Sequence, residues 1–249
     1  MSYQQRIRMF AGPNGSGKST MLEHFEKELS QKLLGVYLNA DDIEKNIKDE
    51  GGKFDFTKYQ LIVSKEKIQK YFDELELLKN ADLEDEINTL KIIDNVILFN
   101  KEILESITSS YFASIIVYIV RHELLLQEVS FTFETVMSSI DKVEFFELAQ
   151  KKGIKTYLYY IATDDPIINV QRIENRVQNG GHNVPEEKIR SRYYRSLSYL
   201  KRVIKASHRT YIYDNSGEKP ELIAEVYKNK LTYKVSKVPY WFMDSMDLI

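Results

Sequence analysis

The chain has 249 residues, of which 43% are hydrophobic, and a net charge of −2 at pH 7. This length suits one large α/β domain or one domain with an insertion. The near-neutral charge gives no general attraction to nucleic acid. The sequence contains no cysteine, which excludes disulfides and thiol chemistry and fits a cytoplasmic protein.

No segment of the sequence predicts a membrane span or a secretion signal. No run of about 18 apolar residues occurs, so we expect no transmembrane helix. Polar residues Gln4, Gln5, Arg6 and Arg8 stand where a signal peptide would be apolar, so we expect no such peptide.

The first predicted strand, residues 7–11, leads into a phosphate-binding loop. Residues 12–19, GPNGSGKS, match the pattern G-x-x-x-x-G-K-[ST], and residues 19–33 read as a helix. The glycines allow a tight turn that aims backbone N–H groups at phosphate oxygens, Lys18 can reach the β- and γ-phosphates, and the Ser19 hydroxyl can bind Mg²⁺. Strand, loop and helix together predict ATP and Mg²⁺ as ligands. The expected cofactor-binding residues of the loop are Gly12, Asn14, Gly15, Ser16, Gly17, Lys18, Ser19 and Thr20.

The second predicted strand, residues 35–39, ends at a pair of acids, Asp41 and Asp42. A carboxylate at this strand end can take the proton from an attacking hydroxyl, or orient that hydroxyl. The alternative is a capping role for the helix that begins near Ile43. Two adjacent acids permit both roles, with Asp41 toward the site and Asp42 as the cap or as a charge in the first turn.

Residues 57–127 carry apolar residues at helical spacing and are too long for a single crossover. We predict a helical insertion at about 54–111, in the form of a hairpin of long helices entered at Gly51-Gly52. Its expected role is packing or a dimer surface.

The third predicted strand, residues 130–134, ends in a glutamate. Glu134 breaks an apolar run, and a charge there is costly unless it is solvated, paired or close to a metal. We therefore expect Glu134 to contact Mg²⁺ or substrate hydroxyls, with Thr135 and Ser138 as further hydrogen-bonding groups.

The rest of the chain continues the alternation of strands and helices. Helices are predicted at 140–152, 166–178 and 185–207, and strands at 156–162 and 210–214. Five strands separated by helices predict an α/β fold of the P-loop NTPase kind, with a parallel sheet covered on both faces, in one domain spanning 1–249. The apolar segment 238–242 is expected to dock on the body of the fold.

Residues 172–207 read as a basic lid. Arg172 and Arg176 share one helix face, and the Gly180-Gly181 break precedes a second basic helix. Arginines in such a lid can neutralise charge on a moving phosphoryl group. His182 beside the glycines can contact phosphate or serve as a structural hydrogen-bonding residue.

Four segments together resemble the zeta toxin family of P-loop kinases: GPNGSGKST, NADDI, FTFET and RVQNGGHNVPEEKIRSRYYRSL. The resemblance implies an ATP-dependent phosphotransferase with an alcohol acceptor, a five-stranded parallel core, and UDP-N-acetylglucosamine as the acceptor. It implies that Asp41 activates the substrate hydroxyl and that Glu134 and Thr135 lie near metal and substrate. It implies that Arg176, or secondly Arg172, contacts the transferred phosphate. It also implies a separate antitoxin protein as a partner.

Two other functions remain open at this point. One is an ATPase switch whose insertion binds a partner. The other is a kinase for another small-molecule or nucleoside acceptor. A kinase for RNA is disfavoured, because no aromatic–basic recognition motif is evident.

Overall fold

The computed structural model describes residues 4–28, 34–74, 83–106, 108–181 and 183–247. The chain divides into two compact units. The core unit comprises residues 1–35 and 130–249, and the inserted unit comprises residues 36–129.

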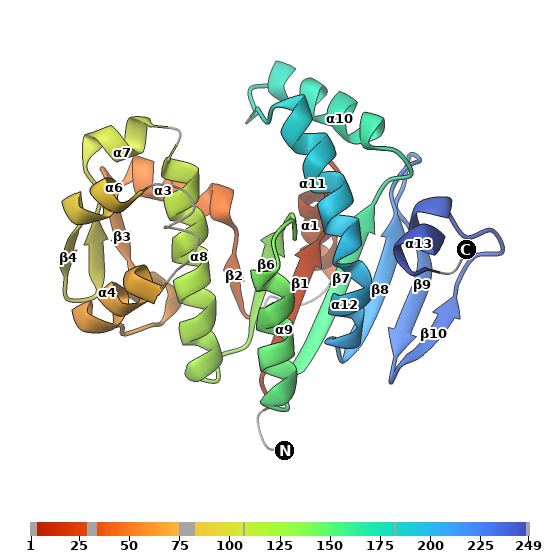
Figure 1. Ribbon diagram of the computed structural model, residues 1–249, viewed down its shortest axis with the longest axis horizontal. Helices are drawn as coiled ribbons and strands as arrows, with labels where there is room; N and C mark the ends of the chain where they lie inside the picture. Colours follow the sequence, from red (N-terminus) through yellow and green to blue (C-terminus); the bar gives the residue numbers. More distant parts are fainter. Residues whose placement is uncertain (1–3, 29–33, 75–82, 107, 182, 248–249) are drawn as a thin grey trace. The chain divides into compact units, whose positions relative to one another are not determined.

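The core unit is built on a mostly parallel sheet whose strands pair in the order β10-β9-β8-β7-β1-β6 (Figure 1). Strand β1 pairs in parallel with β6 and β7, and β7 pairs in parallel with β8. Strands β9 and β10 continue the sheet in antiparallel fashion. The bounds are β1 Arg6–Ala11, β6 Phe131–Thr135, β7 Lys155–Ala162, β8 Arg209–Asp214, β9 Glu221–Tyr227 and β10 Lys230–Tyr233.

The predicted α/β fold is therefore confirmed, and the five expected strands are all present. The second predicted strand is β2 (Val36–Leu38), which opens the inserted unit. Strands β9 and β10 were not predicted.

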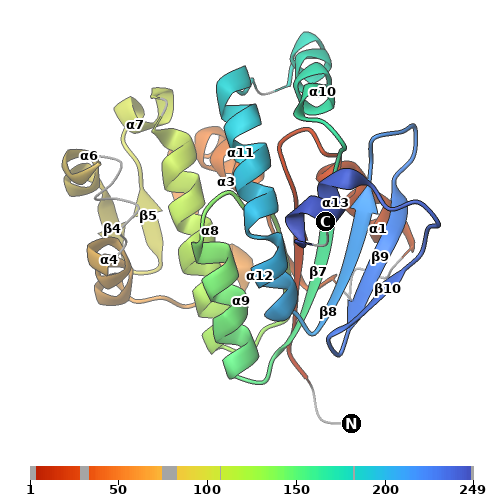
Figure 2. The same cartoon turned by 45° about the vertical axis from the view of Figure 1, so that its right-hand side comes forward.

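Helices cover both faces of the core sheet (Figures 1 and 2). Helix α1 (Lys18–Glu28) lies on one face, where Phe25 meets Phe10 edge-on with ring centroids 5.7 Å apart. Helix α9 (Asp141–Lys151) lies on the other face, where Phe145 and Phe146 pack edge-on against Phe133. Strands β1 and β7 are buried over most of their length because successive side chains face the two helix layers in turn, as expected for a parallel sheet covered on both faces.

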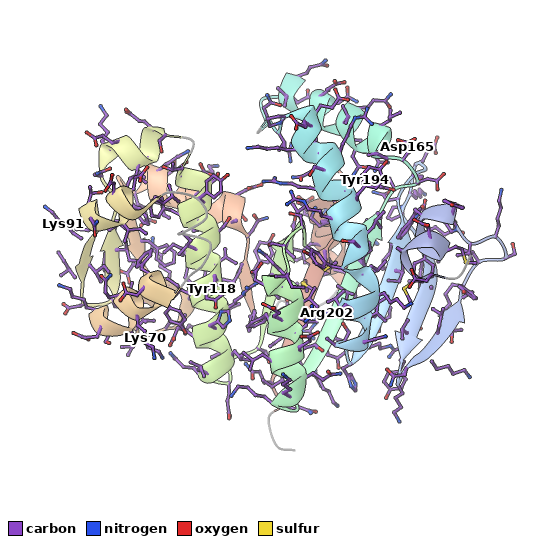
Figure 3. The ribbon with its side chains drawn as sticks, in the orientation of Figure 1. Lys70, Lys91, Tyr118, Asp165, Tyr194 and Arg202 are labelled. Carbon is purple, nitrogen blue, oxygen red and sulfur yellow. The ribbon has the colours of Figure 1, made fainter. Side chains whose placement is uncertain are left out.

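The predicted helix at 166–178 is α10 (Pro166–Gln178). Asp165, labelled in Figure 3, caps it by accepting a hydrogen bond from the Ile167 amide at 2.7 Å, and Pro166 occupies the first turn. The predicted helix at 185–207 is two helices, α11 (Glu186–Ser198) and α12 (Leu200–Lys205). Val170 and Ile173 of α10 pack with Val184 and Ile189, which joins α10 to α11.

The C-terminal segment docks on the core unit, as predicted. Helix α13 (Tyr240–Ser245) buries Trp241 and Phe242. The Trp241 indole N–H donates to the Asp214 carboxylate at 2.6 Å, which fixes α13 at the end of β8.

The inserted unit differs from the predicted helical hairpin. It contains a three-stranded antiparallel sheet in the order β3-β5-β4 as well as helices, so the prediction of two long helices was wrong. Part of the predicted insertion, residues 75–82 and 107, lies outside the described residues. The bounds are α3 Ala40–Asp49, β3 Lys53–Asp55, a 3₁₀ helix Phe56–Tyr59, α4 Lys65–Glu74, α6 Glu84–Thr89, β4 Lys91–Ile93, β5 Val96–Leu98, α7 Lys101–Glu105 and α8 Ser109–Leu126.

Helix α8 is the core helix of the inserted unit. Its 18 residues have a mean hydropathy of 1.2, so by length and composition alone the helix is long and apolar enough to cross a membrane. However, 67% of that stretch is buried inside the fold. The fully buried Glu123 of α8 accepts hydrogen bonds from Lys67 and Tyr71 of α4, each at 2.7 Å. Helix α8 is thus the element around which its neighbours pack.

Candidate functional site

The phosphate-binding loop connects β1 to α1, as predicted, and its glycines stand where no side chain fits. Gly12, Gly15 and Gly17 have φ values of 146°, 74° and 93°. A Cβ atom on Gly12 would lie 1.9 Å from the Ile161 carbonyl oxygen, and one on Gly15 would lie 2.7 Å from the Asn169 carbonyl oxygen. The loop therefore lies directly against the end of β7 and against α10.

Two asparagines hold this loop in place. The Asn169 side-chain amide of α10 donates to the Asn14 carbonyl oxygen at 2.6 Å. The Asn215 amide, just after β8, donates to the Ser16 carbonyl oxygen at 2.8 Å. Asn169 is fully buried, and its side-chain oxygen accepts a hydrogen bond from the Thr163 hydroxyl.

Neither asparagine was predicted from the sequence. Asn215 directly follows the carboxyl end of β8, where sites in such sheets form, so a search of the strand ends for amide side chains would have found it. Asn169 lies inside α10, and no sequence signal marks it.

Lys18 is buried within the loop, at 7% exposure. Its ammonium group donates to the Pro13 carbonyl oxygen at 2.9 Å. An ammonium group carries three N–H donors, so the same group can also donate to a phosphate oxygen. The Ser16 hydroxyl and the Asn14 side-chain oxygen are buried and have no hydrogen-bond partner within the described part of the chain. These unsatisfied polar atoms fit a loop made to receive a polar ligand.

The structure brings together the two residues predicted to bind metal. The Ser19 hydroxyl donates to a carboxylate oxygen of Glu134 at 2.8 Å. Glu134 reaches this position because β6 lies beside β1 in parallel register, with Glu134 opposite Phe10. A hydroxyl and a carboxylate are the hard oxygen ligands that Mg²⁺ takes alongside nucleotide phosphates and water. The residues present therefore fit the ion, although the described residues hold no cluster of three or more His, Asp or Glu that could bind a metal alone.

The other two predicted residues on this strand end shape a turn. The Thr135 hydroxyl accepts a hydrogen bond from the Met137 amide at 3.1 Å, and Met137 has a φ of 55°. Such a backbone conformation is uncommon for residues other than glycine and is often found at functional sites. Ser138 follows directly and is half-buried.

Helix α10 carries both arginines of the predicted lid. Arg172 donates to the Gly217 carbonyl oxygen at 3.3 Å, in the segment between β8 and β9. Arg176 is exposed, and Gly181 packs closely against its side chain. Thr20 is exposed on α1, and His182 lies outside the described residues.

Asp41 belongs to the inserted unit, in the first turn of α3. The cap of this helix is Asn39, whose side chain accepts a hydrogen bond from the Asp41 amide at 2.9 Å. Of the two roles predicted for Asp42, the structure shows the charge in the first turn and not the cap. Both acids are exposed. Partial desolvation of the carboxyl group and the neighbouring Asp41 carboxylate raise the pKa of Asp42 above its usual value.

Comparison with known proteins places the chain in a family. Residues 105–232, just over half of the chain, match the family model described as Zeta toxin. The matched range includes Glu134, Thr135, Ser138, Arg172 and Arg176, but it begins after the phosphate loop and Asp41.

The individual proteins that resemble this chain match it over a short segment or at low sequence identity. An uncharacterized protein of Haemophilus influenzae is 31% identical over 72 residues, which are 29% of this chain and 51% of that protein. A crystal structure of AvrRxo1-ORF1 and -ORF2 with ATP matches with a TM-score of 0.54 and 12% identity, over 93% of this chain and 61% of that chain. The native complex of the same proteins gives 0.53 and 11%, over 98% and 63%. The chain thus spans about half the length of the curated relative and about three fifths of the solved chains. At these identities the solved structures show a shared fold.

Proposed function

The chain belongs to the zeta toxin family of P-loop kinases, and on that basis we propose that it transfers the γ-phosphoryl group of ATP to a hydroxyl group of a small molecule. The observation that carries the proposal is the contact between Ser19 and Glu134 beside the phosphate loop. That contact combines a nucleotide-binding loop with an acidic partner suited to Mg²⁺. The nucleotide in one of the similar solved structures is ATP.

The residues of the loop bind and orient the nucleotide. Backbone N–H groups of the loop and the Lys18 ammonium hold the β- and γ-phosphates, and Ser19 and Glu134 are the groups that would hold Mg²⁺. The bound ion would offset the negative charge that builds up on the phosphate oxygens during transfer. Arg176, with Arg172 second, adds positive charge at the same stage.

The transfer itself forms one bond and breaks another. The acceptor oxygen bonds to the γ-phosphorus, the bond from that phosphorus to the bridging oxygen of ADP breaks, and ADP leaves. We assign the acceptor proton to Asp41 as general base, an assignment that rests on the sequence. We also assign Thr135 and Ser138, from the sequence alone, to hydrogen bonds with hydroxyl groups of the acceptor.

The leading acceptor is UDP-N-acetylglucosamine, which the family resemblance implies, and the alternative is another small molecule or a nucleoside. A separate protein partner that inhibits the enzyme is part of the proposal, supported by the two-component AvrRxo1-ORF1 and -ORF2 complexes that share the fold. The absence of cysteine supports the cytoplasm as its location.

A mass measurement tests this function. Purified protein is incubated with ATP, Mg²⁺ and UDP-N-acetylglucosamine, beside a Lys18→Ala control. A new species heavier by one phosphoryl group, absent from the control, is the expected result. Formation of ADP without any phosphorylated acceptor, in this mixture and with a panel of nucleosides and sugar nucleotides, would favour the ATPase switch instead.

A further inference from the structure

A cavity of about 240 Å³ lies at the amino-terminal edge of the core sheet. Gln4 before β1, Gln150 and residues 153–156 at the α9–β7 turn, and His208 before β8 line it. In Figure 1 this edge is at the lower ends of β1, β7 and β8. The phosphate loop follows the opposite end of β1, about 20 Å away for a strand of this length. The cavity is therefore separate from the nucleotide site.

Unpaired positive charges gather at this edge. Lys155 is directly opposite Arg6 in the register of β1 and β7. Neither side chain has an ion-pair partner among the described residues. Like charges opposite one another on paired strands destabilise a sheet, so an anionic ligand would relieve a cost already present in the fold.

His208 lies in the same positive field. The charged groups that face it are Lys155 from β7, Arg209 from β8 and Lys228 from the β9–β10 turn. Burial, followed by these three cations, lowers the pKa of His208 below its usual value. Glu225, the acid on the neighbouring strand β9, is already paired with Arg209 and Lys234.

The His208 ring is held in a fixed position, yet its nitrogens are free. Tyr157 and Tyr227 pack edge-on against it, with ring centroids 5.8 and 5.6 Å away. Its backbone amide donates to the Thr156 hydroxyl at 3.1 Å. Within the part of the chain that the structure describes, neither ring nitrogen makes a hydrogen bond.

We propose that this cavity binds the phosphoryl group of a small phosphorylated molecule, with Lys155 and His208 as its cationic contacts. The Lys155 ammonium group attracts the anion, and the bound anion in turn favours the protonated form of His208, whose ring N–H groups donate to phosphate oxygens. The cavity is smaller than the roughly 300–1,000 Å³ of pockets for drug-sized ligands, so the ligand is inorganic phosphate or a compact metabolite that carries one phosphate.

The test uses the full chain with Lys18→Ala, which weakens the competing binding of phosphate at the phosphate loop. Inorganic phosphate and ribose 5-phosphate are titrated in turn while the His208 imidazole is followed by NMR, with His208→Asn to assign its signal among the four histidines. A saturable shift and a rise in the His208 pKa are expected, because a bound dianion stabilises the protonated ring. Affinity should therefore fall as the pH rises through the pKa of the complex. Tighter binding of the sugar phosphate would point to a metabolite, and equal binding would point to the phosphate group alone.

Matched variants separate binding from general ionic screening. Lys155→Met should weaken binding at least tenfold, Lys155→Arg should restore it, and Lys219→Met, at an exposed position beyond the other end of β8, should leave it unchanged. Lys155→Met should not lower the melting temperature, since it removes a like-charge contact. No saturable response of His208, or equal loss in the Lys155→Met and Lys219→Met variants, would overturn the proposal.

Discussion

At the residue scale, the phosphate loop is specified by close packing as much as by its turn. Gly15 faces the backbone of α10, and Gly17 faces the Asn215 side chain, whose nitrogen would lie 2.3 Å from an added Cβ. The glycines of the loop are therefore required in this chain because neighbouring residues leave no room for a side chain, as well as because of the ligand.

Gly15→Ala tests this steric requirement. Gly153 has almost the same φ, 72° against 74°, but nothing lies within 4 Å of its added Cβ, so Gly153→Ala is a matched control for backbone strain alone. The control should lose about 1–2 kcal/mol of stability, the usual cost of a left-handed alanine. Gly15→Ala should lose more and also lose ATP binding, measured by thermal unfolding and a fluorescent ATP analogue. Equal behaviour of the two variants would contradict the steric account.

The contact between Ser19 and Glu134 is the second feature at this scale. Glu134→Gln keeps the shape of the side chain but removes the negative charge that suits a metal ion. We expect Mg²⁺ affinity and Mg²⁺-dependent turnover to fall about 10- to 100-fold, the usual range for losses around a metal site. ATP binding without metal should persist. Glu174→Gln, at an exposed glutamate on α10, should change nothing; a matching loss there would rule out a specific role for Glu134.

At the element scale, α10 connects the phosphate loop to the proposed lid. Asn169 donates to the loop, and Arg172 and Arg176 follow three and seven residues later on the same face of the helix. The position of the arginines is thus fixed relative to the loop through one buried amide.

Asn169→Ala should weaken ATP binding and raise the KM for ATP, because the Asn14 carbonyl loses its donor and the loop loses its support. The loss of a buried hydrogen bond also costs about 1–3 kcal/mol of stability. Asn175→Ala, at an exposed position on the same helix, is the control. A lower melting temperature with unchanged ATP affinity would mean that Asn169 only stabilises the fold.

The sequence predicted the long elements well and the short ones poorly. The prediction of helix α10 was correct because a capping acid, a proline and an asparagine mark its ends. The residues of β4 and β5 were wrongly predicted to be helical, because the spacing of Ile92, Val96 and Phe99 also matches the apolar stripe of a helix. Each strand has three residues, too few for alternation to show, and Asp94 at the turn between them has a φ of 49°.

The residues of the site also differ in how far the sequence predicts them. The phosphate loop and Glu134 were predictable, because a fixed pattern marks the loop and a charge interrupts an apolar strand. Asn169 was not, since a single amide in a helix has no sequence signature until the fold places it against the loop.

At the scale of the whole molecule, the chain combines a core unit that resembles other P-loop folds with a large inserted unit. The phosphate loop belongs to the core unit, and Asp41, to which we assign the acceptor proton from the sequence, belongs to the inserted unit. The inserted unit has its own sheet and a largely buried central helix, which gives it a core of its own.

Asp41→Asn should reduce phosphoryl transfer about 10²- to 10⁴-fold, the usual contribution of a general base, while ATP affinity stays unchanged. Asp42→Asn, one residue further along α3, should retain activity. The two variants are compared by the rate of acceptor phosphorylation and by ATP binding. Full activity of Asp41→Asn would show that another group takes the proton.

Phosphoryl transfer from ATP to a small molecule can be measured directly without knowing the acceptor. ATP labelled at its γ-phosphate is incubated with a bacterial metabolite extract and the purified protein, beside the Lys18→Ala variant, and the small molecules are separated. We expect label in a new organic phosphate, and only with the intact protein. Label that appears solely as inorganic phosphate would contradict a kinase and identify the protein as an ATPase.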